Sequence, residues 1–129
     1  MTESKIVAMY RIQNEERWIE KSLEATSEVC QEIVILDDCS TDNTLNICKK
    51  FPKVVDIYER KEPLPLDEVR DRNKLLKIAL TRNPDYVLSI DGDEILAPNS
   101  KEILSEELNV FYPDSKIFEF QFLYFWDKL

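Results

Sequence analysis

The stretch VLSIDGDE, residues 87–94, joins an apolar run directly to Asp91, Asp93 and Glu94. Gly92, the only glycine of the chain, lets the backbone turn there without a Cβ clash. Because a buried strand is rigid and the turn after it is tight, the three carboxylates are expected to converge. Hard cations such as Mg²⁺ take oxygen ligands, usually one or two carboxylates together with phosphate oxygens. The stretch therefore predicts a metal–phosphate site at the end of a strand.

Apolar runs and segments with helical spacing alternate along the rest of the chain. This alternation is typical of a three-layer α/β sandwich with a mostly parallel central sheet. A strictly alternating segment at residues 117–122 predicts one further, half-buried strand with a phenylalanine face. The other predicted strands are residues 6–10, 32–36, 54–58 and 86–90, and the predicted helices are residues 15–28, a segment capped by Ser40 or Thr41, residues 66–82 and residues 100–108.

Polar residues follow three of the predicted strands. They are residues 11–14, residues 37–41 and the acidic residues 91–94. In open parallel sheets, ligands bind beyond the carboxyl ends of the strands. The three polar segments are therefore expected to meet at one edge of the sheet.

Composition narrows the function. The 129 residues fit one domain, and the net charge of −9 argues against a nucleic-acid partner. An acidic chain that binds phosphate must recruit a cation or use a few focused arginines and lysines. The chain has no histidine, which removes the commonest general base, and its three cysteines form no C-x-x-C pair. With no recognisable signal peptide or membrane-spanning run, we expect a cytoplasmic protein, with a peripheral position at the cytoplasmic membrane as the alternative.

The motifs resemble those of the nucleotide-binding half of family 2 glycosyltransferases, which have the GT-A fold. The resemblance runs from residue 6 to about residue 125. Order and spacing match at four places, which are Asn14-Glu15-Glu16, VILDDCSTDNT at residues 34–44, Arg72-Asn73, and LSIDGDE at residues 88–94.

The resemblance implies roles for particular residues. Tyr10, Arg11 and Asn14 are expected near the nucleotide, and Asp37 or Asp38 is expected to accept hydrogen bonds from its base or ribose. Arg72 is expected near the base or diphosphate. The last two implied roles are Asp91 near the ribose and Asp93, with Asp91, as ligands of Mn²⁺ or Mg²⁺ bridging the phosphates.

The resemblance also implies a reaction. A nucleotide-diphosphate sugar, with a UDP-sugar favoured, donates its sugar with inversion to a glycan, lipid or protein acceptor. A divalent cation acts as a Lewis acid on the leaving diphosphate, which agrees with the acidic character of the predicted site.

The chain departs from the family pattern in three ways. Cys39 stands where the family often has glycine, and residues 68–71 (EVRD) replace a small-residue approach to Arg72. No acid after Glu94 sits in a recognisable base motif. The catalytic base is therefore unknown and expected outside this chain, which we interpret as the N-terminal portion of a longer enzyme, truncated after the strand of the metal motif.

Several alternatives remain open from the residues alone. Asp37 and Asp38 could cap the following helix, Asn14 could cap the first helix, and Arg72 could pair with Asp71 or Glu68. Two other functions fit less well: a non-catalytic nucleotide-sugar-binding or assembly module, and a phospho-receiver domain. In the assembly reading, the strand at residues 117–122 would pair chains into a homo-oligomer.

Overall fold

The structure, a computed structural model, describes residues 4–109. Strands and helices alternate strictly along this part of the chain, as the sequence predicts. The elements are β1 (Ile6–Ile12), α1 (Ile19–Ser27), β2 (Glu32–Asp37), α2 (Thr44–Cys48), β3 (Val54–Glu59), α3 (Glu68–Leu80), β4 (Tyr86–Asp91) and α4 (Ser100–Asn109). The predicted strand at residues 117–122 lies outside the described residues.

The four strands of the described part form one sheet in the order β3-β2-β1-β4, and every neighbouring pair is parallel. The register places Ile12 of β1 opposite Asp37 of β2, and Arg11 of β1 opposite Asp91 of β4. The carboxyl ends of β1, β2 and β4 therefore meet at one edge, which we call the carboxyl edge. This edge carries the polar segments that follow these strands.

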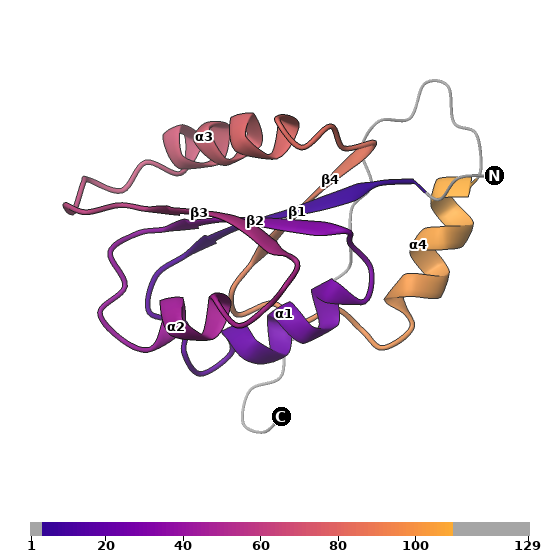
Figure 1. The fold of residues 1–129 in the computed structure, drawn as a ribbon, viewed down its shortest axis with the longest axis horizontal. Helices are drawn as coiled ribbons and strands as arrows, with labels where there is room; N and C mark the ends of the chain where they lie inside the picture. The colour runs from indigo at the N-terminus through magenta and orange to yellow at the C-terminus, as the bar shows by residue number, and fades with distance from the viewer. Residues whose placement is uncertain (1–3, 110–129) are drawn as a thin grey trace.

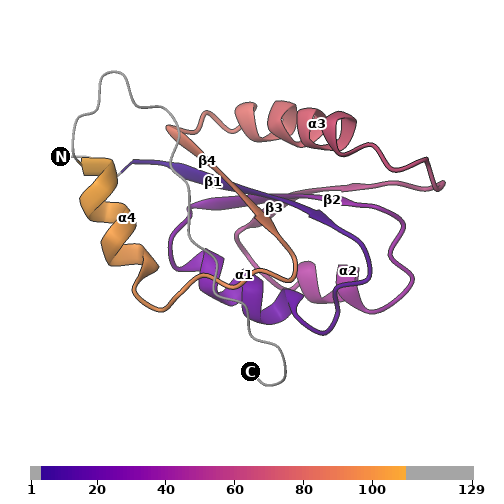
Figure 2. The same cartoon turned by 180° about the vertical axis from the view of Figure 1, so that it is seen from behind.

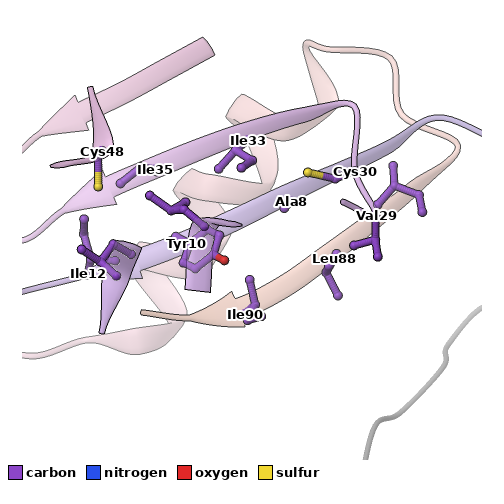
Figure 3. Close-up of a cluster of buried hydrophobic side chains, with 13 residues drawn as sticks. Ala8, Tyr10, Ile12, Val29, Cys30, Ile33, Ile35, Cys48, Leu88 and Ile90 are labelled. Carbon is purple, nitrogen blue, oxygen red and sulfur yellow. The ribbon is translucent and has the colours of Figure 1, made fainter. Parts of the chain in front are cut away.

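Helices cover both faces of the sheet, so the molecule has three layers. Figure 1 and its reverse view, Figure 2, show α3 alone on one face, with α1 and α2 on the other. Alternate residues of β1 divide between the two cores. Val7 and Met9 pack with Leu75 of α3, whereas Ala8, Tyr10 and Ile12 face the α1 side in the cluster drawn in Figure 3. The prediction of a three-layer α/β sandwich with a parallel sheet is confirmed.

The first helix begins later than predicted. Residues 15–18 form a turn, in which the amides of Trp18 and Ile19 both donate to the Glu15 carbonyl at 3.0 and 2.9 Å. Trp18 occupies the N-cap position without a side-chain hydrogen bond. The prediction that Asn14 caps this helix is therefore wrong.

The start of α2 also differs from the prediction. Ser40 and Thr41 lie in the preceding loop, and Asp42 provides the local side-chain acceptor. Its Oδ1 accepts from the amide of Thr44 at 2.9 Å.

The third helix, α3, buries a narrow stripe of side chains against the sheet. Asp67 caps it by accepting a hydrogen bond from the Arg70 amide at 2.9 Å. Leu75 and Ala79, four residues apart, are completely buried against the sheet, whereas Val69 is 72% exposed and Leu80 54% exposed. The buried stripe of α3 is therefore narrower than its apolar sequence.

No helix within residues 4–109 combines the length and the apolar character that crossing a membrane requires. The three cysteines are free thiols, two of them buried in the core.

Candidate functional site

Four of the predicted residues come together at the carboxyl edge as two ion pairs. Arg11 of β1 pairs with Asp38, which follows β2, at 2.6 Å between Nη2 and Oδ2. Arg72 of α3 pairs with Asp91 of β4 at 3.0 Å. Both ion pairs lie on the side of the sheet that α3 covers.

The pair formed by Arg11 and Asp38 belongs to a larger buried arrangement, which we call the four-residue network of Arg11, Asp38, Arg60 and Asp71. Arg60 donates to Asp38 Oδ1 at 2.5 Å and to Asp71 Oδ1 at 2.5 Å. Arg11 Nε completes the ring by donating to Asp71 Oδ2 at 2.8 Å. Two arginines and two aspartates make the network formally neutral.

Asp71 is the most enclosed member of the network, because its side chain is completely buried. Burial alone would favour the neutral acid. Hydrogen bonds from Arg60, Arg11 and Arg70 outweigh this effect and hold the pKa of Asp71 well below its usual range. Hydrogen bonding to Asp71 likewise raises the pKa of Arg60. Asp71 therefore stays ionised in the folded protein across the physiological pH range.

Arg60 and Asp71 were not predicted as site residues, although the sequence holds a signal for each. Arg60 directly follows β3, just as Asp38 follows β2. Asp71 directly precedes Arg72, and the sequence alone offered only an ion pair between the two as an alternative. In the structure Arg72 donates to Asp91 and to Ser89 Oγ, so the pairing of Arg72 with Asp71 or Glu68 is wrong.

The two neighbouring aspartates at the end of β2 point to different faces of the sheet. Asp37 shares the parity of Ile33 and Ile35 and is 1% exposed. Its Oδ2 accepts from the Ser40 amide at 3.1 Å, and its Oδ1 has no hydrogen-bond partner among the described residues. Asp38 alone reaches the arginines on the α3 side.

Asn14 joins the loop after β1 to the loop after β2. Its φ of 51° lies in the left-handed region, which asparagine tolerates better than most residues. Its Oδ1 accepts from the amides of Thr41 and Asp42 at 2.7 and 3.3 Å, and its own amide donates to Ser40 Oγ at 2.9 Å. These bonds give Asn14 a role in holding the two loops together, and they do not place it in the network.

The Tyr10 ring lies in the core instead of at the carboxyl edge. The ring is completely buried among the side chains of the cluster in Figure 3. Its hydroxyl donates to Thr26 Oγ1 at 2.6 Å and contacts Ser22 Oγ at 2.9 Å. Burial raises the pKa of Tyr10 to about 12. The ring is therefore not positioned to contact a nucleotide base in this structure, which corrects the expectation. The physical reason is that Tyr10 shares the parity of Ala8 and Ile12.

The Tyr10 hydroxyl is also linked, through Ser22, to the backbone of residues 91–94, which we call the acidic turn. Ser22, which contacts the Tyr10 hydroxyl, donates from Oγ to the Glu94 carbonyl at 2.5 Å. Within the turn, Glu94 Oε1 accepts from the Asp91 amide at 2.9 Å, and the Glu94 amide donates to the Asp91 carbonyl at 3.0 Å. These bonds fix the backbone of residues 91–94, while Asp93 remains exposed.

The φ of Gly92 is not positive, so its backbone conformation does not itself require glycine. The residue is needed instead for close packing. A Cβ at this position would lie 2.9 Å from Glu15 Cγ and 3.2 Å from Ile12 Cγ2. Both distances are shorter than ordinary contacts. The glycine therefore allows the loop after β1 to pack directly against the acidic turn.

The acidic turn has the donor set of a hard-cation site. Burial raises the pKa of Glu15, and the nearby charges of Asp93, Asp91 and Asp42 raise it further, which shows that these carboxylates act on one small region. Among residues 4–109, no group of three or more histidine, cysteine, aspartate or glutamate side chains is arranged to hold a metal. The residues present fit a cation held by one or two carboxylates and completed by phosphate oxygens and water.

Comparison with known proteins agrees with this geometry. Residues 7–115 match the family described as glycosyl transferase family 2. Among curated proteins, the chain is 30% identical over 122 residues to the dTDP-rhamnosyl transferase RfbG of Shigella flexneri, covering 80% of this chain and 42% of that protein. It is 32% identical over 91 residues to the SPbeta prophage-derived glycosyltransferase SunS of Bacillus subtilis strain 168, covering 70% of this chain and 20% of that protein.

Solved structures show the same fold. A crystal structure of S. aureus TarS 1-349 in complex with UDP matches with a TM-score of 0.60 and 26% identity, over 81% of this chain and 31% of that one. The mannosyltransferase PcManGT of Pyrobaculum calidifontis, solved with GDP-Man and Mn²⁺, matches with a TM-score of 0.59 over 84% of this chain and 32% of that one. Its identity of 20% supports the shared fold alone.

The chain spans 20% of SunS and 42% of RfbG, so it corresponds to a part of each. The match to the family covers most of the chain and includes the acidic turn, Arg72 and the residues after β2. No support remains for the phospho-receiver alternative. The chain belongs to glycosyl transferase family 2 and has the GT-A fold.

Proposed function

We propose that this chain binds a nucleotide-diphosphate sugar at the carboxyl edge and forms the donor-binding part of a glycosyltransferase. One observation carries the proposal: the fold brings a guanidinium, Arg72, into contact with Asp91 at the start of an acidic turn whose Asp93 is exposed. A diphosphate needs positive charge, and a bridging cation needs carboxylates. TarS, which shares 26% identity with this chain, has been solved with UDP, and this supports a UDP-sugar as the donor.

Arg72 is well suited to the diphosphate. Its side chain is 35% exposed and that of Asp91 is 46% exposed. Exposed ion pairs contribute little stability, so Arg72 can exchange Asp91 for a phosphate at small cost. Arginine also matches phosphate oxygens with two parallel hydrogen bonds.

Asp38 and Arg11 are suited to the base or ribose. Each oxygen of Asp38 accepts one hydrogen bond from the network and keeps a second lone pair. Arg11 uses Nε and Nη2 within the network, and its Nη1 has no hydrogen-bond partner among the described residues. A ligand at this edge therefore finds a hydrogen-bond acceptor, Asp38, beside a hydrogen-bond donor, Arg11.

We further propose that Asp93, with Asp91, holds Mn²⁺ or Mg²⁺. When bound, the cation stabilises the negative charge that develops on the departing diphosphate. Around it, this chain's residues orient the donor: Arg72 binds phosphate oxygens, and the backbone bonds of the turn keep Asp91 in place.

The transfer itself is proposed to proceed with inversion. The acceptor oxygen bonds to the anomeric carbon as the bond to the diphosphate breaks, and the proton of the acceptor hydroxyl passes to a general base. We assign no general base within residues 4–109. The acids of α4 lie at the opposite end of the sheet, because α4 packs beside Ile6 and Val29.

The proposal is tested by thermal shifts with UDP, GDP, CDP and dTDP, each with and without Mn²⁺. A ligand that binds only the folded state raises the melting temperature in proportion to RT ln(1 + [L]/Kd). For at least one nucleotide, the rise in melting temperature with nucleotide and Mn²⁺ together is expected to exceed the sum of the rises that each produces alone. Purely additive shifts for all four nucleotides would remove the proposal.

A further inference from the structure

We infer that Arg60 is a positioning residue that, together with Asp71, holds Asp38 and Arg11 in the orientation in which they meet the nucleotide. The inference rests on the proposed function. It assigns a role to a side chain that has no direct access to the ligand, because the Arg60 side chain is 6% exposed.

Arg60 bridges the two aspartates of the network. Nη1 donates to Asp38 Oδ1 at 2.5 Å, and Nη2 donates to Asp71 Oδ1 at 2.5 Å. Because a guanidinium is planar and rigid, these two bonds fix the distance between the residue that follows β2 and the helix α3. Arg11 makes the same connection from the other side, to Asp38 Oδ2 and Asp71 Oδ2.

The backbone of Arg60 is tied to the same loop as its side chain. Its amide donates to the Asp37 carbonyl at 2.9 Å, and its carbonyl accepts from Cys39 Sγ at 3.2 Å. Contacts on both sides of Asp38 therefore join residue 60 to residues 37–39. Movement of Arg60 would be passed directly to Asp38.

Stability alone is a weak reason for this arrangement. Removing charges from water costs as much as buried ion pairs commonly return, so a neutral, apolar packing would serve the fold as well. The network instead leaves the free lone pairs of Asp38 and the free Nη1 of Arg11 at the carboxyl edge. A binding group whose orientation is fixed in advance loses less entropy when the ligand arrives.

Substitution of Arg60 by lysine tests this inference. Arg60→Lys keeps the positive charge and loses the planar bridge. We expect the Kd for UDP in the presence of Mn²⁺, measured by calorimetry, to rise about tenfold. Binding of Mn²⁺ alone, followed by the electron paramagnetic resonance signal of the free ion, should stay unchanged, since the acidic turn lies outside the network. A merely structural role would leave both values unchanged or weaken both together.

Arg82→Lys is the matched control. Arg82 makes two hydrogen bonds to Glu32, at 2.7 and 3.0 Å, at the opposite end of the sheet. This variant should lose its bidentate pair without any change in the Kd for UDP. An equal change in both variants, or none in Arg60→Lys, would overturn the inference while nucleotide binding by the unchanged protein stands.

A second measurement uses the unchanged protein, in case Arg60→Lys does not fold. The Nε proton of Arg11 and the Nη protons of Arg60, which make the hydrogen bonds of the network, are followed by NMR as UDP and Mn²⁺ are added. Their exchange with water should be slow both without and with the ligand, because a positioning network persists in the complex. Loss of protection on binding would contradict the inference. Failure of the unchanged protein to bind UDP with Mn²⁺ would overturn both this inference and the proposed UDP-sugar donor.

Discussion

Replacing Asp71 by asparagine perturbs the most enclosed charge of the protein. The carboxylate accepts hydrogen bonds from Arg11, Arg60 and Arg70, and its side chain has no exposed surface. Asparagine offers one acceptor oxygen and no charge, so Arg60 would keep only Asp38 as its anionic partner. Removing one partner from a buried ion pair costs about 3–5 kcal/mol. Since domains are stable by about 5–15 kcal/mol, this loss should be large but measurable.

Urea unfolding, followed by circular dichroism, measures the loss. The pKa of Asp71 is depressed in the folded state, so its contribution is complete above the ordinary aspartate pKa and declines as the pH falls below it. The difference between the unchanged protein and Asp71→Asn should therefore be constant from about pH 7 to pH 5 and shrink below about pH 4.

Glu32→Gln is the control, because Glu32 pairs with Arg82 and Lys5 at the protein surface. Its substitution should cost less than about 1 kcal/mol. If Asp71→Asn costs no more than Glu32→Gln at pH 7, the account of the network is refuted. A difference that grows as the pH falls would refute the assignment of the ionised state.

Three further substitutions probe the carboxyl edge and the core beside it. Tyr10→Phe removes the hydroxyl that bonds Thr26 and should cost about 1–2 kcal/mol in urea unfolding, with no cost meaning that the hydroxyl is dispensable. Gly92→Ala brings a Cβ within 2.9 Å of a neighbouring side chain and should cost about 1–3 kcal/mol in thermal unfolding, whereas an unchanged melting temperature would show that the loop yields. Arg72→Met frees Asp91 from a competing cation, so Mn²⁺ alone should bind more tightly and UDP about tenfold more weakly. Parallel changes in both affinities would contradict the exchange of Arg72 between Asp91 and phosphate.

The convergence of the polar segments could be predicted from the sequence, because it depends only on strand order along the chain and on parallel pairing. Asp38 and Asp91 were placed at the correct edge for this reason, whereas the place of Arg72 was implied only by the resemblance to the family. The partner of Arg72 could not be predicted. Asp91 is 19 residues away in the chain, and their contact depends on how α3 docks on the sheet.

Side-chain direction accounts for the misplaced residues. Tyr10 ends an apolar run and is next to Arg11, yet alternation along β1 sends the two side chains to opposite faces. The same rule separates Asp37 from Asp38. Applied strictly to the predicted strands, this parity would have assigned Tyr10 to the core.

Cys39 is a departure from the family that the structure explains only in part. Its φ of 59° lies in the left-handed region, where the glycine common in the family is unstrained. The contact of its Sγ with the Arg60 carbonyl ties it to the network instead. Cys39, with its left-handed backbone, therefore lies in the same loop as Asp38 of the network.

The affinity of UDP measured by calorimetry with and without Mn²⁺, in the unchanged protein and in Asp93→Asn, tests the central claim most directly. Glu102→Gln on α4 removes another exposed acid, far from the carboxyl edge, and serves as the control. The unchanged protein and Glu102→Gln should bind UDP at least about tenfold more tightly with Mn²⁺ than without, and Asp93→Asn should lose this difference. Equal affinities in all three proteins, with or without Mn²⁺, would contradict a metal-assisted nucleotide-sugar site at this edge.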